Sequence, residues 1–113
     1  MRKITLLAIL AMVFISLSAQ QGGFMGPRAE VVTVEQAKTM RDDDPVTLRG
    51  RIERALGNER YLFSDETGSI TIEIERKVWG TLTVDENDLI EISGEIERKR
   101  TRIEVEVKTI RKL

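Results

Sequence analysis

Hydrophobic and polar residues alternate along most of the second half of the chain, a period of two that is typical of β-strands. The alternation holds in five segments, which we place at residues 46–53, 60–64, 70–74, 89–97 and 102–108. Turn residues separate them, for example Gly57-Asn58 and the run Asp65-Glu66-Thr67-Gly68. We therefore expect an antiparallel β-body with one face of each strand turned toward a core.

Two glycines fall on the inward-facing side of predicted strands, Gly50 in the first and Gly94 in the fourth. A mid-strand glycine weakens a strand unless the backbone bends sharply or carries a bulge there. Five strands, glycine kinks and a break at residues 77–79 predict a mainly β fold, a five-stranded Greek-key barrel of the OB type. Tyr61 and Phe63 share the inward parity, which leaves Leu62 outward, and we expect Trp79 to cover one end of the barrel.

A short helix precedes the barrel. Thr33 and Gln36 have the spacing of a capping box, and Val34, Ala37 and Met40 recur at helical intervals. The acidic run 42–44 followed by Pro45 should end this helix near Arg41.

The N-terminus has the order of a secretory signal peptide: basic Arg2 and Lys3, an apolar run over residues 4–17, and small residues up to Ala19. Fourteen helical residues rise about 21 Å, less than the roughly 30 Å of a membrane core, which favours a cleaved signal over an anchor. We expect a signal peptide at 1–19, a flexible Gly-rich lead at 20–32 and the OB domain with its helix at 33–113. The expected location is the periplasm, with no membrane span after cleavage.

The amino-acid composition limits the kinds of chemistry that we expect of this chain. The 113 residues include 18 Lys and Arg, 19 Asp and Glu, and neither histidine nor cysteine. Loss of Arg2 and Lys3 with the signal peptide would change the net charge from −1 to −3, which gives no general attraction to nucleic acid. The commonest general base and the strongest nucleophile are both missing. We expect no enzyme activity, no catalytic residue, no cofactor and no metal site.

Short blocks spread over the chain resemble one known family. They are Gly23-Phe24-x-Gly26-Pro27, Thr33-Val34-x-Gln36-Ala37, Asp42-Asp43-x-x-Val46-Thr47-Leu48-x-Gly50, Tyr61-Leu62-Phe63-x-Asp65-x-Thr67-Gly68, Lys77-Val78-Trp79, Leu82-Thr83-Val84, Asp88, Ile90-x-Ile92-x-Gly94-Glu95 and Val107-Lys108-x-Ile110-Arg111-Lys112. Together they resemble the bacterial OB-fold (BOF) family, also called the NirD/YgiW/YdeI family of stress-tolerance proteins. The resemblance implies a periplasmic OB-fold protein linked to envelope stress, with no catalytic residues to carry over. The turn Arg98-Lys99-Arg100 is more basic than its counterpart in the family.

OB folds usually bind ligands on the outer face of their second and third strands and the adjoining loops. The candidate ligand-binding residues are Arg49, Arg51, Arg60, Leu62, Thr71, Glu73, Trp79, Lys99 and Arg100. Nucleic acid is disfavoured because stacking aromatics are missing and Glu73 and Glu75 would repel phosphates. For the arginines, cross-strand ion pairs on a wet face are the favoured interpretation.

Acidic residues alternate on the last two predicted strands, at Glu91, Glu95, Glu97, Glu104 and Glu106. They could attract cationic peptides, polyamines or divalent metal, but solvated charge that blunts strand aggregation is the favoured reading. The acidic run 42–44 lacks the spacing of a calcium loop.

We therefore expect a periplasmic OB-fold binding module that contributes to envelope stress tolerance. Its partner would be a small or cationic ligand, a cell-wall component or a periplasmic protein. Two alternatives stay open: a protein–protein interaction module without a small ligand, and a weak polyanion binder that uses the turn from Arg98 to Arg102.

Overall fold

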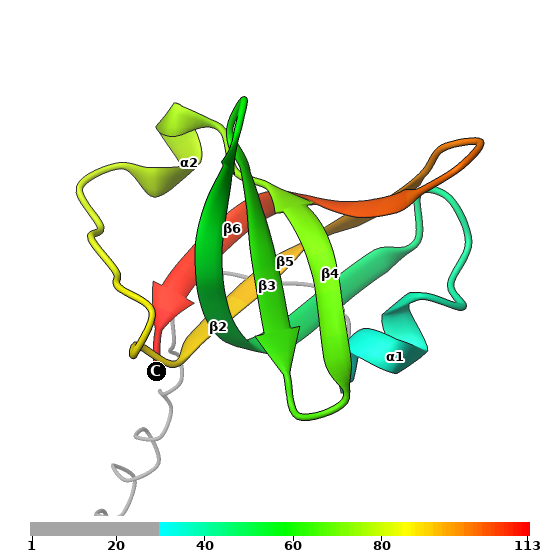
Figure 1. Ribbon diagram of the computed structural model, residues 1–113, viewed down its shortest axis with the longest axis horizontal. Helices are drawn as coiled ribbons and strands as arrows, with labels where there is room; N and C mark the ends of the chain where they lie inside the picture. The colour runs from blue at the N-terminus through cyan, green and yellow to red at the C-terminus, as the bar shows by residue number, and fades with distance from the viewer. Residues whose placement is uncertain (1–29) are drawn as a thin grey trace, which may run out of the picture.

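The chain forms a closed β-barrel with a helical turn near each end (Figure 1). The computed structural model describes residues 30–113, so the predicted signal peptide and most of the Gly-rich lead lie outside the described residues. The elements are β1 (Val31–Val32), α1 (Val34–Ala37), β2 (Pro45–Gly57), β3 (Arg60–Asp65), β4 (Gly68–Glu73), α2 (Arg76–Trp79), β5 (Ile90–Arg98) and β6 (Ile103–Lys112).

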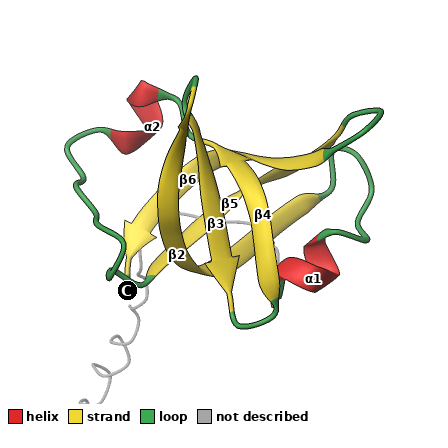
Figure 2. Cartoon of the chain, viewed as in Figure 1, coloured by secondary structure: helices red, strands yellow, loops and turns green. Residues whose placement is uncertain are grey.

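The strands are hydrogen-bonded in the order β1-β2-β3-β4-β6-β5, and pairing of β2 with β5 closes the barrel (Figure 2). The long β2 pairs with two strands in succession: residues 45–50 pair with β5, and residues 51–57 pair with β3. The pairing between β4 and β6 is parallel and covers only Thr71–Glu73 against Glu104–Glu106. This is the predicted five-stranded OB barrel, with the two-residue β1 added as a parallel edge beside β2.

The barrel interior is filled by the inward half of the alternating pattern. Its buried side chains are Val34, Ala37, Val46, Leu48, Ile52, Phe63, Ile70, Ile72, Ile74, Ile90, Ile92, Ile96, Val105 and Val107. Tyr61 was expected among them but is half-buried at the rim, and Leu62 on the outer face is half-buried as well. Burial of these branched side chains is the main source of stability in a chain without disulfides.

The two inward glycines mark places where strands touch without room for a side chain. A Cβ on Gly50 would overlap the carbonyl oxygen of Ser64 and lie 3.0 Å from the Phe63 ring. A Cβ on Gly94 would overlap the carbonyl oxygen of Glu106, and the β5–β6 register shifts between Ser93 and Gly94. Both predicted bends are therefore close backbone approaches that glycine permits.

Helix α1 is anchored to the barrel at its first residues. The capping box is present: the Thr33 side chain accepts from the Gln36 backbone N–H, and the Gln36 side chain accepts from Thr33 N–H. Asp65, the last residue of β3, accepts from Val34 N–H at 2.9 Å. The regular helix ends at Ala37, earlier than the predicted Arg41, and continues as turns to Met40.

The predicted break at residues 77–79 belongs to α2, a single helical turn at the other end of the barrel from α1 (Figure 1). In residues 30–113, none of the helices has the length and apolar character needed to cross a bilayer.

Candidate functional site

Two of the three arginines predicted on the outer face, Arg49 and Arg60, are bound to buried carboxylates, whereas Arg51 Nε donates to the backbone carbonyl oxygen of Asn87 at 3.4 Å. Arg49 Nε donates to Glu91 Oε1 at 2.9 Å, and Arg111 donates to the same carboxylate from β6 at 3.3 Å. Glu91 is only 5% exposed, although the alternation predicted a solvated side chain. Burial alone would raise the pKa of Glu91, but hydrogen bonds from Arg49 and Arg111 outweigh it and lower the pKa.

A second buried carboxylate repeats this arrangement where β6 closes against β4. Glu104, 2% exposed, accepts from Arg60 on β3 at 3.0 Å and from Arg102 at 2.9 Å. Burial opposes ionisation, yet the two guanidinium groups bring the pKa of Glu104 below its ordinary value, and Glu104 raises the pKa of Arg60. The prediction of solvated carboxylates is thus wrong for Glu91 and Glu104, and the prediction of cross-strand ion pairs is confirmed for Arg49 and Arg60.

The rest of the outer face mixes both signs of charge. Strand register places Arg60, Glu73, Glu106 and Glu95 in one row across β3, β4, β6 and β5. Burial first, and then neighbouring Glu97 and Glu106, raise the pKa of Glu73 against the opposing effect of Arg60. Lys108 lies 3.6 Å from Glu106. Leu62 and Thr71 are half-buried in the next row. The face therefore presents no uniform field to a polyanion.

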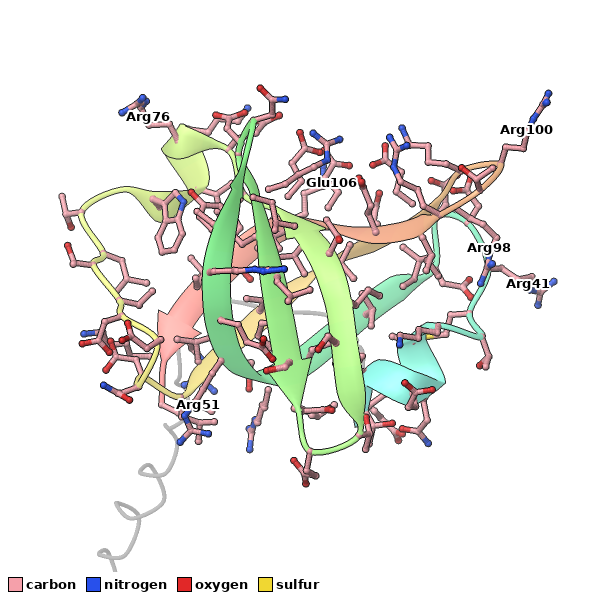
Figure 3. All side chains as sticks on the ribbon, in the orientation of Figure 1. Arg41, Arg51, Arg76, Arg98, Arg100 and Glu106 are labelled. Atoms are coloured by element: carbon pink, nitrogen blue, oxygen red, sulfur yellow. The ribbon has the colours of Figure 1, made fainter. Side chains whose placement is uncertain are left out.

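Most of the basic β5–β6 turn is also engaged. The Arg98 guanidinium donates to the carbonyl oxygens of Lys38 and Met40 at 2.7 and 2.8 Å, which ties the hairpin to the residues after α1. Arg102 bonds to Glu104, and Lys99 lies 3.9 Å from Glu97. Arg100 projects from the tip of the hairpin (Figure 3).

A hollow near α2 is lined by two aromatic rings. Its volume is about 250 Å³, and its apolar wall comes from Ile52, Ala55, Tyr61, Trp79 and Val84. The Tyr61 and Trp79 rings meet edge to face, with centroids 5.6 Å apart and planes at 75°. A smaller hollow of about 150 Å³ lies beside the same two rings and is lined also by Glu59, Ile74 and Arg76.

Local backbone geometry positions the charged residues around these rings. The β2–β3 register shifts between Ile52 and Arg54, so the intervening Glu53 lies at an irregularity of the strand. Asp85 and Glu86 belong to the loop after α2, and the Asp85 side chain accepts from Asn87 N–H at 2.8 Å. The larger hollow thus has three carboxylates and one guanidinium, that of Arg54, among its lining residues.

Of the nine predicted ligand-binding residues, Trp79 alone lines the two hollows; the other eight lie on the outer face or the β5–β6 turn. Sequence reasoning missed Tyr61, Glu53, Asp85 and Glu86 as members of a site. A usable signal was present, because the acidic stretch 85–88 follows the single tryptophan closely. Across residues 30–113, no three acidic side chains are arranged to hold a metal ion.

Comparison with known proteins gives relatives along nearly the whole chain. The family described as Bacterial OB fold (BOF) protein matches residues 15–112. Protein YgiW of Escherichia coli K12 is 44% identical over 110 residues, covering 86% of this chain and 85% of that protein. The calcium-regulated OB-fold protein CarO of Pseudomonas aeruginosa is 30% identical over 90 residues, 78% of each chain.

The fold agrees with these sequence matches. The solved structure of ygiW from E. coli superposes with a TM-score of 0.75 at 45% identity and covers 82% of this chain and 100% of that one. Sequence and structure lead to one assignment: the chain belongs to the bacterial OB-fold (BOF) family.

Proposed function

We propose that this chain is a non-catalytic binding module of the bacterial envelope, which takes a small ligand into the hollow beside Trp79. The observation that carries the proposal is the hollow itself, an aromatic-walled recess of about 250 Å³ on a fold that serves binding. Its volume approaches the lower limit of ordinary ligand pockets, which suits a small molecule or one side chain of a larger partner.

The charges on the outer face disfavour a nucleic-acid ligand. Arg49 and Arg60 are bound to Glu91 and Glu104, so a phosphate would have to compete with buried carboxylates for them. The half-buried Tyr61 and Trp79 pack against each other at the barrel end and are not arranged as successive stacking platforms along a strand face.

The envelope location and the role in stress tolerance rest on the signal-like order of residues 1–19 and on the family resemblance. Intact-mass analysis of the protein exported by a Gram-negative host should show cleavage near Ala19. A full-length product retained in the membrane would overturn the location.

The binding function is tested with the single tryptophan, since emission excited at 295 nm reports on Trp79 alone. A panel of small molecules, including amines, sugars and cell-wall fragments, should contain compounds that shift this emission saturably and raise the melting temperature. Tight binding of single-stranded DNA at near-physiological salt, lost in a Lys99→Ala, Arg100→Ala variant, would contradict the proposal and favour the basic turn.

A further inference from the structure

We infer that the hollow beside Trp79 selects an aliphatic ammonium ion, the class that includes linear diamines and lysine-like side chains. The inference rests on the proposed function and adds the chemistry of the ligand. It draws on three features: the aromatic walls of the hollow, its carboxylates, and the smaller hollow that shares both rings.

The aromatic walls suit a cation. An ammonium group near the face of a tryptophan or tyrosine ring is attracted by the negative charge density of the π-system, and tryptophan is the strongest of these partners. Because the Tyr61 and Trp79 planes stand at 75°, the two rings offer differently oriented walls to one guest. The apolar side chains of Ile52 and Val84 complete a surface for methylene groups.

The charged residues favour the same guest. Glu53, Asp85 and Glu86 contribute three negative charges to the lining, against one positive charge from Arg54. Within residues 30–113, neither Glu53 nor Glu86 forms an ion pair, so both carboxylates are available to a bound cation. The buried Glu91 and Glu104, by contrast, already hold two guanidinium groups each.

The smaller hollow beside the same two rings brings a further carboxylate near them. It shares Tyr61 and Trp79 with the larger one and adds the carboxylate of Glu59, which accepts from Arg76 N–H at 3.3 Å. The Arg76 side chain points away from the barrel (Figure 3). A linear diamine could therefore place one ammonium group near Glu53 and Glu86 and the other near Glu59, with its methylene chain along the rings.

Titration of Trp79 emission with matched probes tests the inference: 1,5-diaminopentane, n-pentylamine and the neutral 1,5-pentanediol. We expect saturable binding in the order diamine, monoamine, diol, with the diamine at least tenfold tighter than the diol. If the diol binds as tightly as the diamine, the ammonium inference fails while the proposed small-ligand function stands. If no probe and no compound of the wider panel binds, the proposed function itself fails.

Charge-matched variants locate the site. Glu53→Gln with Glu86→Gln should weaken diamine binding about tenfold, whereas Glu66→Gln with Glu95→Gln, an equal change of net charge at exposed positions outside both hollows, should change it less than twofold. Equal weakening by both pairs would show nonspecific attraction and overturn the assignment.

Trp79→Leu, measured by calorimetry, should abolish binding, while Trp79→Phe should retain part of it. Thermal denaturation of each variant establishes that it is folded.

Discussion

The two ends of the barrel are built in contrasting ways. At the α1 end, backbone donors at the start of the helix are held by side chains: Asp65 accepts from Val34 N–H, and Thr67 accepts from Glu35 N–H at 3.1 Å. At the α2 end, the N-cap residue Glu75 forms no side-chain capping bond, a single longer bond of 3.3 Å joins Arg76 N–H to the Glu59 carboxylate, and α2 contains no fully buried residue. Both hollows lie here, against Tyr61 and Trp79.

This contrast teaches where the fold is stabilised and where it is left adaptable. A one-turn helix has too few internal hydrogen bonds to be stable alone, so it persists only through its caps and its packing. α1 has both, because Val34 and Ala37 are buried and its first N–H groups are bonded. Among the backbone N–H groups of α2, only that of Arg76 is bonded to a side chain, that of Glu59, and Val78 and Trp79 are only partly buried against the core. An element with less buried surface is suited to a site that a ligand must enter.

The largest effect should come from the barrel wall that both ends share. Gly50→Val would drive a side chain into the carbonyl oxygen of Ser64 and should lower the free energy of unfolding by about 3 kcal/mol. Urea denaturation followed by Trp79 fluorescence and by far-UV circular dichroism should give coincident transitions, because both ends depend on one barrel. An unchanged midpoint would show that β2 and β3 can separate at this position.

A change at the α1 end should come next in size. Asp65→Ala removes the acceptor of Val34, Thr67 and Gly68 N–H groups and should cost about 2 kcal/mol, similar to loss of a strong helix cap. Trp79→Phe at the α2 end keeps an aromatic ring and should cost less than about 1 kcal/mol. If the two substitutions are equally destabilising by chemical denaturation, the contrast between the ends is wrong.

Of these changes, a moderate fall in pH from neutrality should alter the free energy of unfolding least. It should act mainly through carboxylates that lie outside the two hollows. Burial tends to raise the pKa of Asp65, but bonds from Thr67, Val34 and Gly68 lower it, and Glu91 and Glu104 are also lowered. Carboxylates with lowered pKa values stabilise the fold fully above their unfolded values, near 4, and lose this contribution as the pH falls through the folded values. Glu73, whose pKa is raised, contributes with the opposite sign.

Unfolding free energies measured by urea at pH 7, 5 and 3 check this dependence. We expect little change from pH 7 to 5 and a marked loss at pH 3. Glu104→Gln should reduce the loss between pH 5 and pH 3, whereas the exposed Glu66→Gln should leave it unchanged. An equal acid response in both variants would remove Glu104 from the explanation.

Most of the fold could be predicted because it follows from local periodicity. The alternation at Val46, Leu48 and Ile52 and the two inward glycines specify strands that bend, and the capping box of Thr33 and Gln36 specifies where α1 begins. Strand β1 was not predictable in this way, since two residues carry no period and its parallel pairing with β2 depends on the finished barrel. The length of α1 was overestimated because Met40 has helical spacing but lies in a turn.

The candidate site was less predictable, because period two distinguishes only inward from outward positions. Outward does not mean solvated on a small barrel: long arginine side chains from other strands cover Glu91 and Glu104. The hollow depends on the β2 irregularity at Glu53 and on the path of the loop that carries Asp85. These two segments are about 30 residues apart in the sequence and meet only in the folded chain. Trp79 could be recognised from composition, and Asp85 and Glu86 from their closeness to it in the sequence, but nothing in the sequence placed Glu53 and Tyr61 beside them.

The short parallel contact between β4 and β6 has a consequence for the lifetime of the fold. It is far shorter than the β5–β6 pairing, so it is the place where the barrel can open with the fewest broken hydrogen bonds. Arg60 on β3 reaches past this seam to Glu104 on β6. We expect this bond to form late in folding, because it joins residues 44 positions apart, and interactions absent from the transition state slow unfolding without speeding folding. The Arg60–Glu104 pair would then act chiefly on how long the native barrel stays closed.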